Sequence, residues 1–277
     1  METANAVQRR SSEKVTFSFG QNWQDFVTSH LTPERERIAM ASLTGFLEQQ
    51  DLQGLSFLDI GCGSGLFSLA AVRLGARRIV SVDVDPYSVD CTRRLRETVG
   101  SPCSWQVVSG SILDDFCVSQ LEPADIVYAW GSLHHTGSMW EAIRNTCKLV
   151  APGGLLYLAI YNKVEGRGGS QYWLRVKRLY NRCPSPAKRL MEFAYILRHQ
   201  VLPNLVRFKH PFSSWRNYHQ GRGMSPWIDV RDWLGGYPYE FASADHIFRF
   251  CSREMGFTLV NLRTANNIGV NEFLFRR

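Results

Sequence analysis

The segment FLDIGCGSG, residues 57–65, constrains the fold of this chain more than any other feature. An apolar run of strand length, 55–60, leads into Gly61, Gly63 and Gly65, and the helical pattern FSLAAVRLG follows directly. Glycines at such a turn let the backbone bend sharply and approach a ligand closely. The segment therefore predicts a strand, a ligand-binding turn and a helix, which is the opening unit of an α/β domain.

Strand and helix patterns alternate along the next hundred residues. We expect strands at 77–84, 104–110, 124–130 and 155–161, with helices following Pro86 and over 139–150. Two later runs, 257–263 and 270–275, follow an expected helix at 244–255 and could pair antiparallel at one edge. This order predicts a Rossmann-like, doubly wound α/β fold with a mostly parallel, seven-stranded sheet and an antiparallel last strand.

The alternation stops between residues 163 and 240, where aromatic and basic residues dominate. We expect a helical basic insertion there, a main domain formed by 34–162 and 241–277, and an N-terminal aromatic segment over 1–33. Thr32 and Pro33 form a helix start, and that helix is expected to run to about Gln50.

Positive charge is concentrated in this insertion. Residues 161–222 hold 13 Lys and Arg against two acids, while the whole chain has a net charge of +7. The simplest interpretation is helices that pack on the sheet with solvated basic faces. The alternatives are a lid over an acidic or phosphorylated substrate, which the positive field would attract, or a surface helix on anionic lipid.

Several other classes of protein and site are disfavoured. The seven cysteines form no Cys-x-x-Cys pair, which argues against a disulfide framework and a zinc site. No Asp/His cluster has metal-ligand spacing, so we expect no metal. The N-terminal residues lack the apolar core of a signal peptide, and no apolar run approaches the roughly 20 residues that span a bilayer. We expect a cytoplasmic protein without a transmembrane segment, and peripheral membrane contact stays open.

The residues around the glycine turn restrict its ligand. Leu66 occupies the sixth position, where a NAD-type fingerprint needs glycine. Asp59 would repel a pyrophosphate but attract a cationic group, such as the ammonium of a methionine moiety, unless it only orders the turn. Asp83 ends the second strand and is placed to accept hydrogen bonds from two ribose hydroxyls, whereas Asp85 is expected to cap the next helix. Together these residues predict S-adenosyl-L-methionine as the cofactor.

Four motifs now carry a family resemblance. LDIGCGSG, VSVDVDP, DIVYAWGSLHHTGSMWEAI and KLVAPGGLLYLAIYN resemble, in this order and spacing, the motifs of class I S-adenosylmethionine-dependent methyltransferases. The LHH and PGG elements are similar to the subgroup of ubiquinone- and menaquinone-biosynthesis methyltransferases. The flanks FSFGQNW, RGMSPWIDVRDWLGGYPYE and GVNEF look like a bacterial branch labelled as ubiquinone-type O-methyltransferases.

The turn, the strand ends and the resemblance together yield a set of expected cofactor contacts. Ser111 stands where many family members carry an acidic residue that bonds the adenine amine, so that contact departs from the pattern. The N-terminal aromatics are expected either to close the cofactor pocket or only to dock on the core. The full set is Asp59, Gly61, Cys62, Gly63, Gly65, Asp83, Val84, Ser111, Ile112, Trp130, Gly131, Leu133, Phe19 and Trp23.

His134 and His135 follow the fourth strand, at the sheet edge where such folds bind ligands. Histidine suits a catalytic base near neutral pH, although either ring can instead fix the loop or pack under the cofactor. We expect a methyltransferase that acts on an oxygen (hydroxyl, phenol or carboxylate) of a small anionic molecule. The alternatives are methylation of RNA or another polyanion, N-, C- or S-methylation of a small metabolite, and a binding scaffold without chemistry. Nucleic acid is the less favoured partner, because no Asn-Pro-Pro-Tyr-type motif or nucleic-acid-binding module is present.

Overall fold

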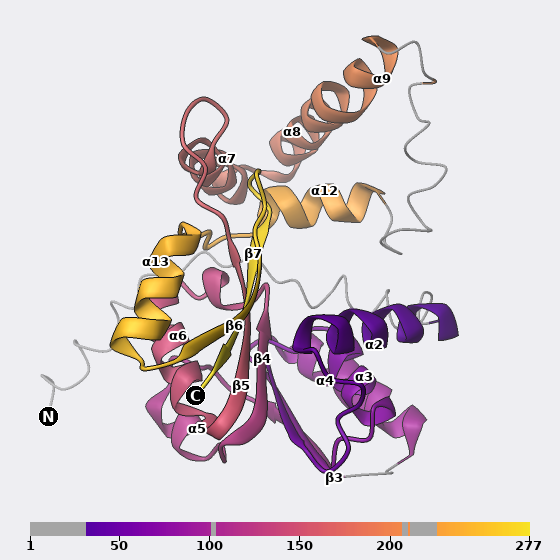
Figure 1. The fold of residues 1–277 in the computed structure, drawn as a ribbon. Coiled ribbons are helices and arrows are strands. Elements are labelled where there is room, and N and C mark those ends of the chain that lie inside the picture. The colour runs from indigo at the N-terminus through magenta and orange to yellow at the C-terminus, as the bar shows by residue number, and fades with distance from the viewer. Residues whose placement is uncertain (1–31, 101–103, 207–209, 211–225) are drawn as a thin grey trace, which may run out of the picture.

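The computed structural model of the chain describes residues 32–100, 104–206, 210 and 226–277. Its sheet has seven strands in the order β3-β2-β1-β4-β5-β7-β6 (Figure 1). From β3 to β5 all neighbours are parallel, and β7 is antiparallel to both β5 and β6. The predicted fold class is confirmed, including the antiparallel pairing of the last two strands. The strands are β1 (Ser56–Ile60), β2 (Arg78–Asp83), β3 (Ser104–Ser109), β4 (Ala124–Trp130), β5 (Val150–Tyr161), β6 (Thr258–Arg263) and β7 (Val270–Arg276).

Helices cover both faces of this sheet (Figure 1). Helices α2 (Pro33–Leu47), α3 (Leu66–Arg73) and α4 (Pro86–Val99) lie on one side, and α5 (Asp115–Ser119), α6 (Met139–Lys148) and α13 (Ala244–Arg249) on the other. Alternate residues of a strand point to opposite faces, so β4 contributes to two cores. Ile126 and Tyr128 pack in the core under α2 and α3, whereas Val127 and Ala129 pack in the core under α6 and α13.

The ends of two helices follow local chemistry. Thr32 caps α2, as expected, because its hydroxyl accepts the backbone N–H of Arg35. This helix stops at Leu47, short of Gln50, since Glu48 adopts a left-handed conformation with φ of 57°. Asp85 caps α4 by accepting the N–H of Tyr87, which is the role predicted for it.

The described parts of the predicted insertion before the last two strands are mainly helical. It contains α7 (Ser170–Arg182), α8 (Ser185–Ile196), the π-helix η2 (Leu197–Val201), α9 (Leu202–Val206) and α12 (Pro226–Gly235). Trp173, Tyr180, Ile196, Val230 and Leu234 belong to a third apolar cluster, distinct from the two cores of the sheet. The helices of the insertion lie beyond the end of β5 (Figure 1), and their cluster also contacts Tyr161 of that strand.

The chain re-enters the sheet domain at Ala242, which bridges to Asn162 in parallel. Helix α13 and the π-helix η3 (Phe250–Glu254) follow, where one helix was expected over 244–255. None of the helices in the described ranges is long and apolar enough to cross a membrane.

Candidate active site

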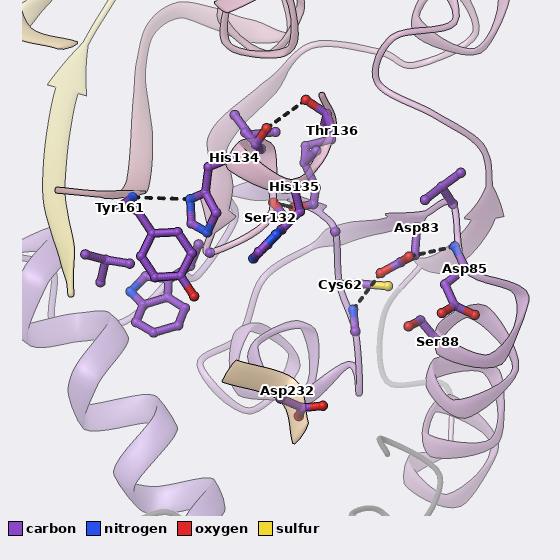
Figure 2. A pocket seen from close by; sticks show the side chains of 18 of the residues that line it. Cys62, Asp83, Asp85, Ser88, Ser132, His134, His135, Thr136, Tyr161 and Asp232 are labelled. Carbon is purple, nitrogen blue, oxygen red and sulfur yellow. Dashed lines mark hydrogen bonds between the residues drawn. The ribbon is translucent and has the colours of Figure 1, made fainter. Parts of the chain in front are cut away.

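A cavity of about 1280 Å³ opens at the carboxyl ends of β1, β2, β4 and β5. One end is lined by the glycine turn and by Asp83, and the other by side chains of the insertion, among them Tyr195 and Trp233. Figure 2 shows Asp83, His134 and His135 of this cavity, with Asp232 of the insertion nearby. The two ends of the cavity are therefore built by different parts of the chain.

The glycine turn needs glycine for backbone reasons. Gly61, Gly63 and Gly65 have φ values of 76°, 54° and 78°, in the left-handed region that other residues avoid. A Cβ on Gly61 would also lie 2.3 Å from the Cβ of Ser132, whose hydroxyl donates to the carbonyl of Ile60 at 2.7 Å. The turn after β1 is thus packed directly against the turn after β4.

Asp59 is only 2% exposed and lines the cavity. Its carboxylate accepts the hydroxyl of Ser68 at 2.6 Å, and Ser68 contacts Ser81, which accepts the indole N–H of Trp105. Burial, assisted by the charge of Asp83, raises the pKa of Asp59 to about 7. The bond to Ser68 ties Asp59 to α3 rather than to an amide of the glycine turn, and a cationic ligand group would offset the cost of burying this charge.

Asp83 is held by two backbone amides (Figure 2). One oxygen accepts the N–H of Gly63 and the other accepts the N–H of Asp85, each at 2.9 Å. Burial raises the pKa of this carboxyl, and these amides oppose the rise. Each carboxylate oxygen has a second lone pair, so Asp83 can accept two further donors, as a ribose diol requires. The side chain of Val84 beside it is 71% exposed and gives the cavity an apolar face.

Ser111 and Ile112 line the cavity after β3. The hydroxyl of Ser111 accepts the N–H of Leu113 at 3.1 Å, and Asn145 of α6 donates to the carbonyl of Ile112 at 3.0 Å. This turn is therefore fixed by its own bonds and by α6.

His135 belongs to the short 3-10 helix η1 (Leu133–His135), directly after β4. Its Nδ1 lies 2.6 Å from the carbonyl oxygen of Pro238. A carbonyl can only accept, so Nδ1 carries the proton and Nε2 carries the lone pair. Burial lowers the pKa of His135 to about 4, which keeps the ring neutral at pH 7.

His134 has the opposite tautomer. The backbone N–H of Tyr161 donates to its Nδ1 at 3.3 Å (Figure 2), so the proton of the neutral ring lies on Nε2. Burial lowers the pKa of this ring well below its usual value. Its Nε2 is buried and has no hydrogen-bond partner among the described residues. The two neighbouring histidines are therefore held in different tautomers.

Aromatic rings surround the far end of the cavity. Tyr161, Trp233 and Tyr237 line it, and the Tyr161 ring lies 4.0 Å from that of His134. Lys177 of α7 lies behind Trp233, with its ammonium 3.9 Å from the ring centroid. It is fully buried and donates to the carbonyl of Trp233, and burial lowers its pKa to about 7.

Part of this chain is similar in sequence to known methyltransferases. Residues 40–154 match the family described as ribosomal protein L11 methyltransferase (PrmA). The ubiquinone biosynthesis O-methyltransferase of Methylobacterium sp. (strain 4-46) is 32% identical over 117 residues, 42% of this chain and 45% of that protein. The ribosomal protein L11 methyltransferase of Photobacterium profundum is 30% identical over 131 residues, 46% of this chain and 41% of that protein. The chain thus spans less than half the length of the curated relatives it matches.

Solved structures extend the likeness beyond the matched segment. The magnesium protoporphyrin IX methyltransferase from Synechocystis PCC 6803 with bound SAH has a TM-score of 0.55 to this chain, at 14% identity, and 94% of each chain is covered. An O-methyltransferase family protein from Burkholderia thailandensis has a TM-score of 0.54, at 14% identity, and covers 92% of this chain and 59% of that one. The chain has the class I S-adenosylmethionine-dependent methyltransferase fold.

This methyltransferase fold gathers most of the residues singled out from the sequence. The following line one cavity: Asp59, Gly61, Cys62, Gly63, Asp83, Val84, Ser111, Ile112, Trp130, Gly131, Leu133, His134 and His135. Gly65 does not line it, because it caps α3 and packs against Thr92. Phe19 and Trp23 lie outside the described residues. Among the described residues no three His, Cys, Asp or Glu side chains are grouped closely enough to hold a metal ion.

The sequence patterns do not assign Lys177 or Trp233 to the site. Lys177 is one of the 13 basic residues of the insertion, and Trp233 lies within the segment RGMSPWIDVRDWLGGYPYE. The signal for Lys177 was available, since Trp173, Lys177 and Tyr180 share one face of a helix at i, i+4 and i+7. A lysine on an apolar helical face predicts burial, which is what the structure shows.

Proposed function

We propose that this chain transfers a methyl group from S-adenosylmethionine to an oxygen of a small aromatic hydroxyl compound, which reacts as its anion, the phenolate. The observation that carries the proposal is one cavity that joins the carboxylates of Asp59 and Asp83 to a ring-lined end containing His135. A cavity that holds both groups suits methyl transfer, where positioning of the two reactants supplies much of the rate.

The residues at the glycine turn fit the cofactor. Asp59 is buried without a cationic partner in the described structure and matches an ammonium, and Asp83 has acceptor capacity for two hydroxyls. The exposed side chain of Val84 provides a surface on which a flat base can pack. When bound, S-adenosylmethionine supplies an electrophilic methyl group on a sulfonium.

One of the two histidines suits a task at the acceptor oxygen. The Nε2 lone pair of His135 can take a proton from a hydroxyl, whereas the Nε2 of His134 is buried. With a pKa of about 4, His135 is a weak base for a phenol, whose pKa is about 10 in water. The proposal therefore needs a second influence that favours the phenolate.

Lys177 supplies that influence in its protonated form, which a pKa of about 7 keeps partly populated at neutral pH. Besides burial, its charge lowers the pKa of both His134 and His135, so its field reaches the cavity wall. A positive charge in a low-dielectric setting stabilises a nearby phenolate. Arg175, Arg178 and Arg189 of the insertion face solvent, and no Lys or Arg lines the cavity among the described residues.

A protein acceptor is the second candidate, because the matched family and one relative are described as ribosomal protein L11 methyltransferases. That match ends at residue 154, within β5, and so covers the cofactor half. The insertion that lines the acceptor end lies outside it. The match therefore bears on the methyl donor more than on the acceptor.

One experiment separates the two candidates. The full chain is incubated with methyl-labelled S-adenosylmethionine and, in parallel, with a panel of phenols and benzoates and with purified ribosomal protein L11. Mass spectrometry then locates the added methyl group. We expect a methyl ether on a phenol, formed by the wild type and nearly lost in Lys177→Met and His135→Ala. Label found only on the protein, or on a carboxylate or nitrogen, would overturn the proposed acceptor.

A further inference from the structure

Residues 185–206 form one continuous helical segment through α8, η2 and α9, at the edge of the molecule farthest from α5 (Figure 1). The three elements have 12, 5 and 5 residues, so the segment is about 33 Å long at 1.5 Å per residue. Such a length gives the segment two distinct faces along several turns.

The inner face of this segment packs against the rest of the protein. Ile196 is buried in the cluster of the insertion, and Tyr195 and Gln200 line the acceptor end of the cavity. Glu192 is buried, accepts the hydroxyl of Tyr180 at 2.6 Å, and pairs with Arg231. The side chains that hold the segment in place therefore occupy this face.

The outer face is apolar and exposed to solvent. Leu190, Phe193 and Leu197 follow the i, i+3, i+7 spacing of one helical face, and Leu202, Leu205 and Val206 continue along the segment. These six side chains are between 40% and 78% exposed. A row of large apolar groups along a helix marks an interaction surface rather than scattered surface hydrophobes.

The charges beside this row have one sign. Arg189 and Arg198 are exposed and adjoin Leu190 and Leu197 in the chain, whereas Lys188 is partly exposed with its ammonium over the ring of Tyr180. The single acidic residue in 185–206 is Glu192, which is turned inward and paired. The outer surface thus combines apolar side chains with cations and carries no carboxylate of its own.

We propose that the outer face of α8–η2–α9, which we call the apolar arm, binds the surface of an anionic lipid bilayer. Leucine and phenylalanine side chains enter the boundary of the acyl chains while arginines meet the negative headgroups, as in interfacial amphipathic helices. A second copy of the chain fits this face less well. Two-fold pairing sets a patch against itself and would bring Arg189 and Arg198 toward cations of the same kind.

The proposal does not depend on the reaction, but it has a geometric consequence for the site. Tyr195 and Gln200 reach the cavity from the same helical segment that carries the arm's outer side chains. A helix with its side chains is about 10–12 Å across. The bilayer surface would therefore lie about one helix diameter from the acceptor end of the cavity.

The test is cosedimentation of the full chain with phosphatidylcholine vesicles, with and without phosphatidylglycerol. We expect binding to the anionic vesicles, and weaker binding to phosphatidylcholine alone. The triple variant Leu190→Ser/Phe193→Ser/Leu197→Ser should bind at least about 100-fold more weakly, since each buried side chain contributes about tenfold. Phe116→Ser is the matched control, because Phe116 is 74% exposed on α5 at the opposite end of the molecule and should leave binding unchanged.

A second pair of substitutions isolates the charge. Arg189→Gln/Arg198→Gln should reduce binding to anionic vesicles about tenfold or more and leave weak binding to phosphatidylcholine unaffected. Circular dichroism checks that each variant folds, which is expected because the altered side chains are exposed. Absence of wild-type binding, or equal binding by the triple variant, would overturn the proposal. So would vesicle-independent dimerisation that the triple variant abolishes, since the occupant would then be a second copy.

Discussion

Replacement of Asp59 by Asn should stabilise the protein and weaken its cofactor site at the same time. Asp59 is 2% exposed, and burial with the nearby charge of Asp83 raises its pKa from 3.8 to about 7. The pKa of this carboxyl is higher in the folded than in the unfolded protein. The stability that it contributes is therefore fully present below its pKa in the unfolded state and is lost as the pH rises through 7. At about 1.4 kcal/mol per pKa unit, a shift of about three units amounts to about 4 kcal/mol of unfolding free energy.

Asparagine has nearly the same shape and can still accept the hydroxyl of Ser68, but it never ionises. The unfolding free energy of Asp59→Asn should therefore exceed that of the wild type at pH 8. This difference in unfolding free energy between variant and wild type should increase by about 3 kcal/mol from pH 5 to pH 8. Most of the stability that the wild type loses through ionisation of Asp59 is lost in that pH range. Urea unfolding of both proteins at the two pH values measures this difference. A difference that stays constant would show that Asp59 keeps an ordinary pKa and would refute the reasoning.

Three further changes test other parts of the site. His135→Ala should lower turnover at least about 100-fold with little change in S-adenosylmethionine affinity, and unchanged turnover would exclude His135 as the base. Gly61→Ala should abolish cofactor binding because its Cβ would meet Ser132 at 2.3 Å, whereas Gly45→Ala, with no atom within 4 Å, should bind normally in the same calorimetric titration. Lys177→Met should become more stable relative to the wild type as the pH falls from 9 to 6. The pKa of Lys177 is lowered from 10.5 to about 7 in the folded protein, so the wild type loses stability over that range. A difference in unfolding free energy between the two proteins that does not change with pH would contradict this.

The cofactor half could be predicted because its signals are local. The glycines after β1 need left-handed backbone, and Asp59 and Asp83 stand at fixed positions near the ends of two parallel strands. Parallel strands bring their carboxyl ends to one edge of a sheet, so short-range patterns were enough to place these groups together.

The acceptor half could not be predicted in the same way, because its chemistry depends on distant contacts. The tautomer of His135 is set by Pro238, 103 residues away in the chain, and that of His134 by the backbone of Tyr161. No local pattern specifies these pairs. The sequence did indicate amphipathic helices in the insertion, but the expected solvated basic face proved in α8 to carry Leu190 and Phe193 as well.

Calorimetric titration of the full chain with S-adenosylmethionine tests the central claim most directly, with Asp83→Ala as the paired variant. We expect saturable binding at one site, competed by S-adenosylhomocysteine. Loss of two hydrogen bonds to a charged acceptor should weaken binding by Asp83→Ala about 100-fold. Absence of binding by the wild type, or equal affinity in the variant, would contradict the account.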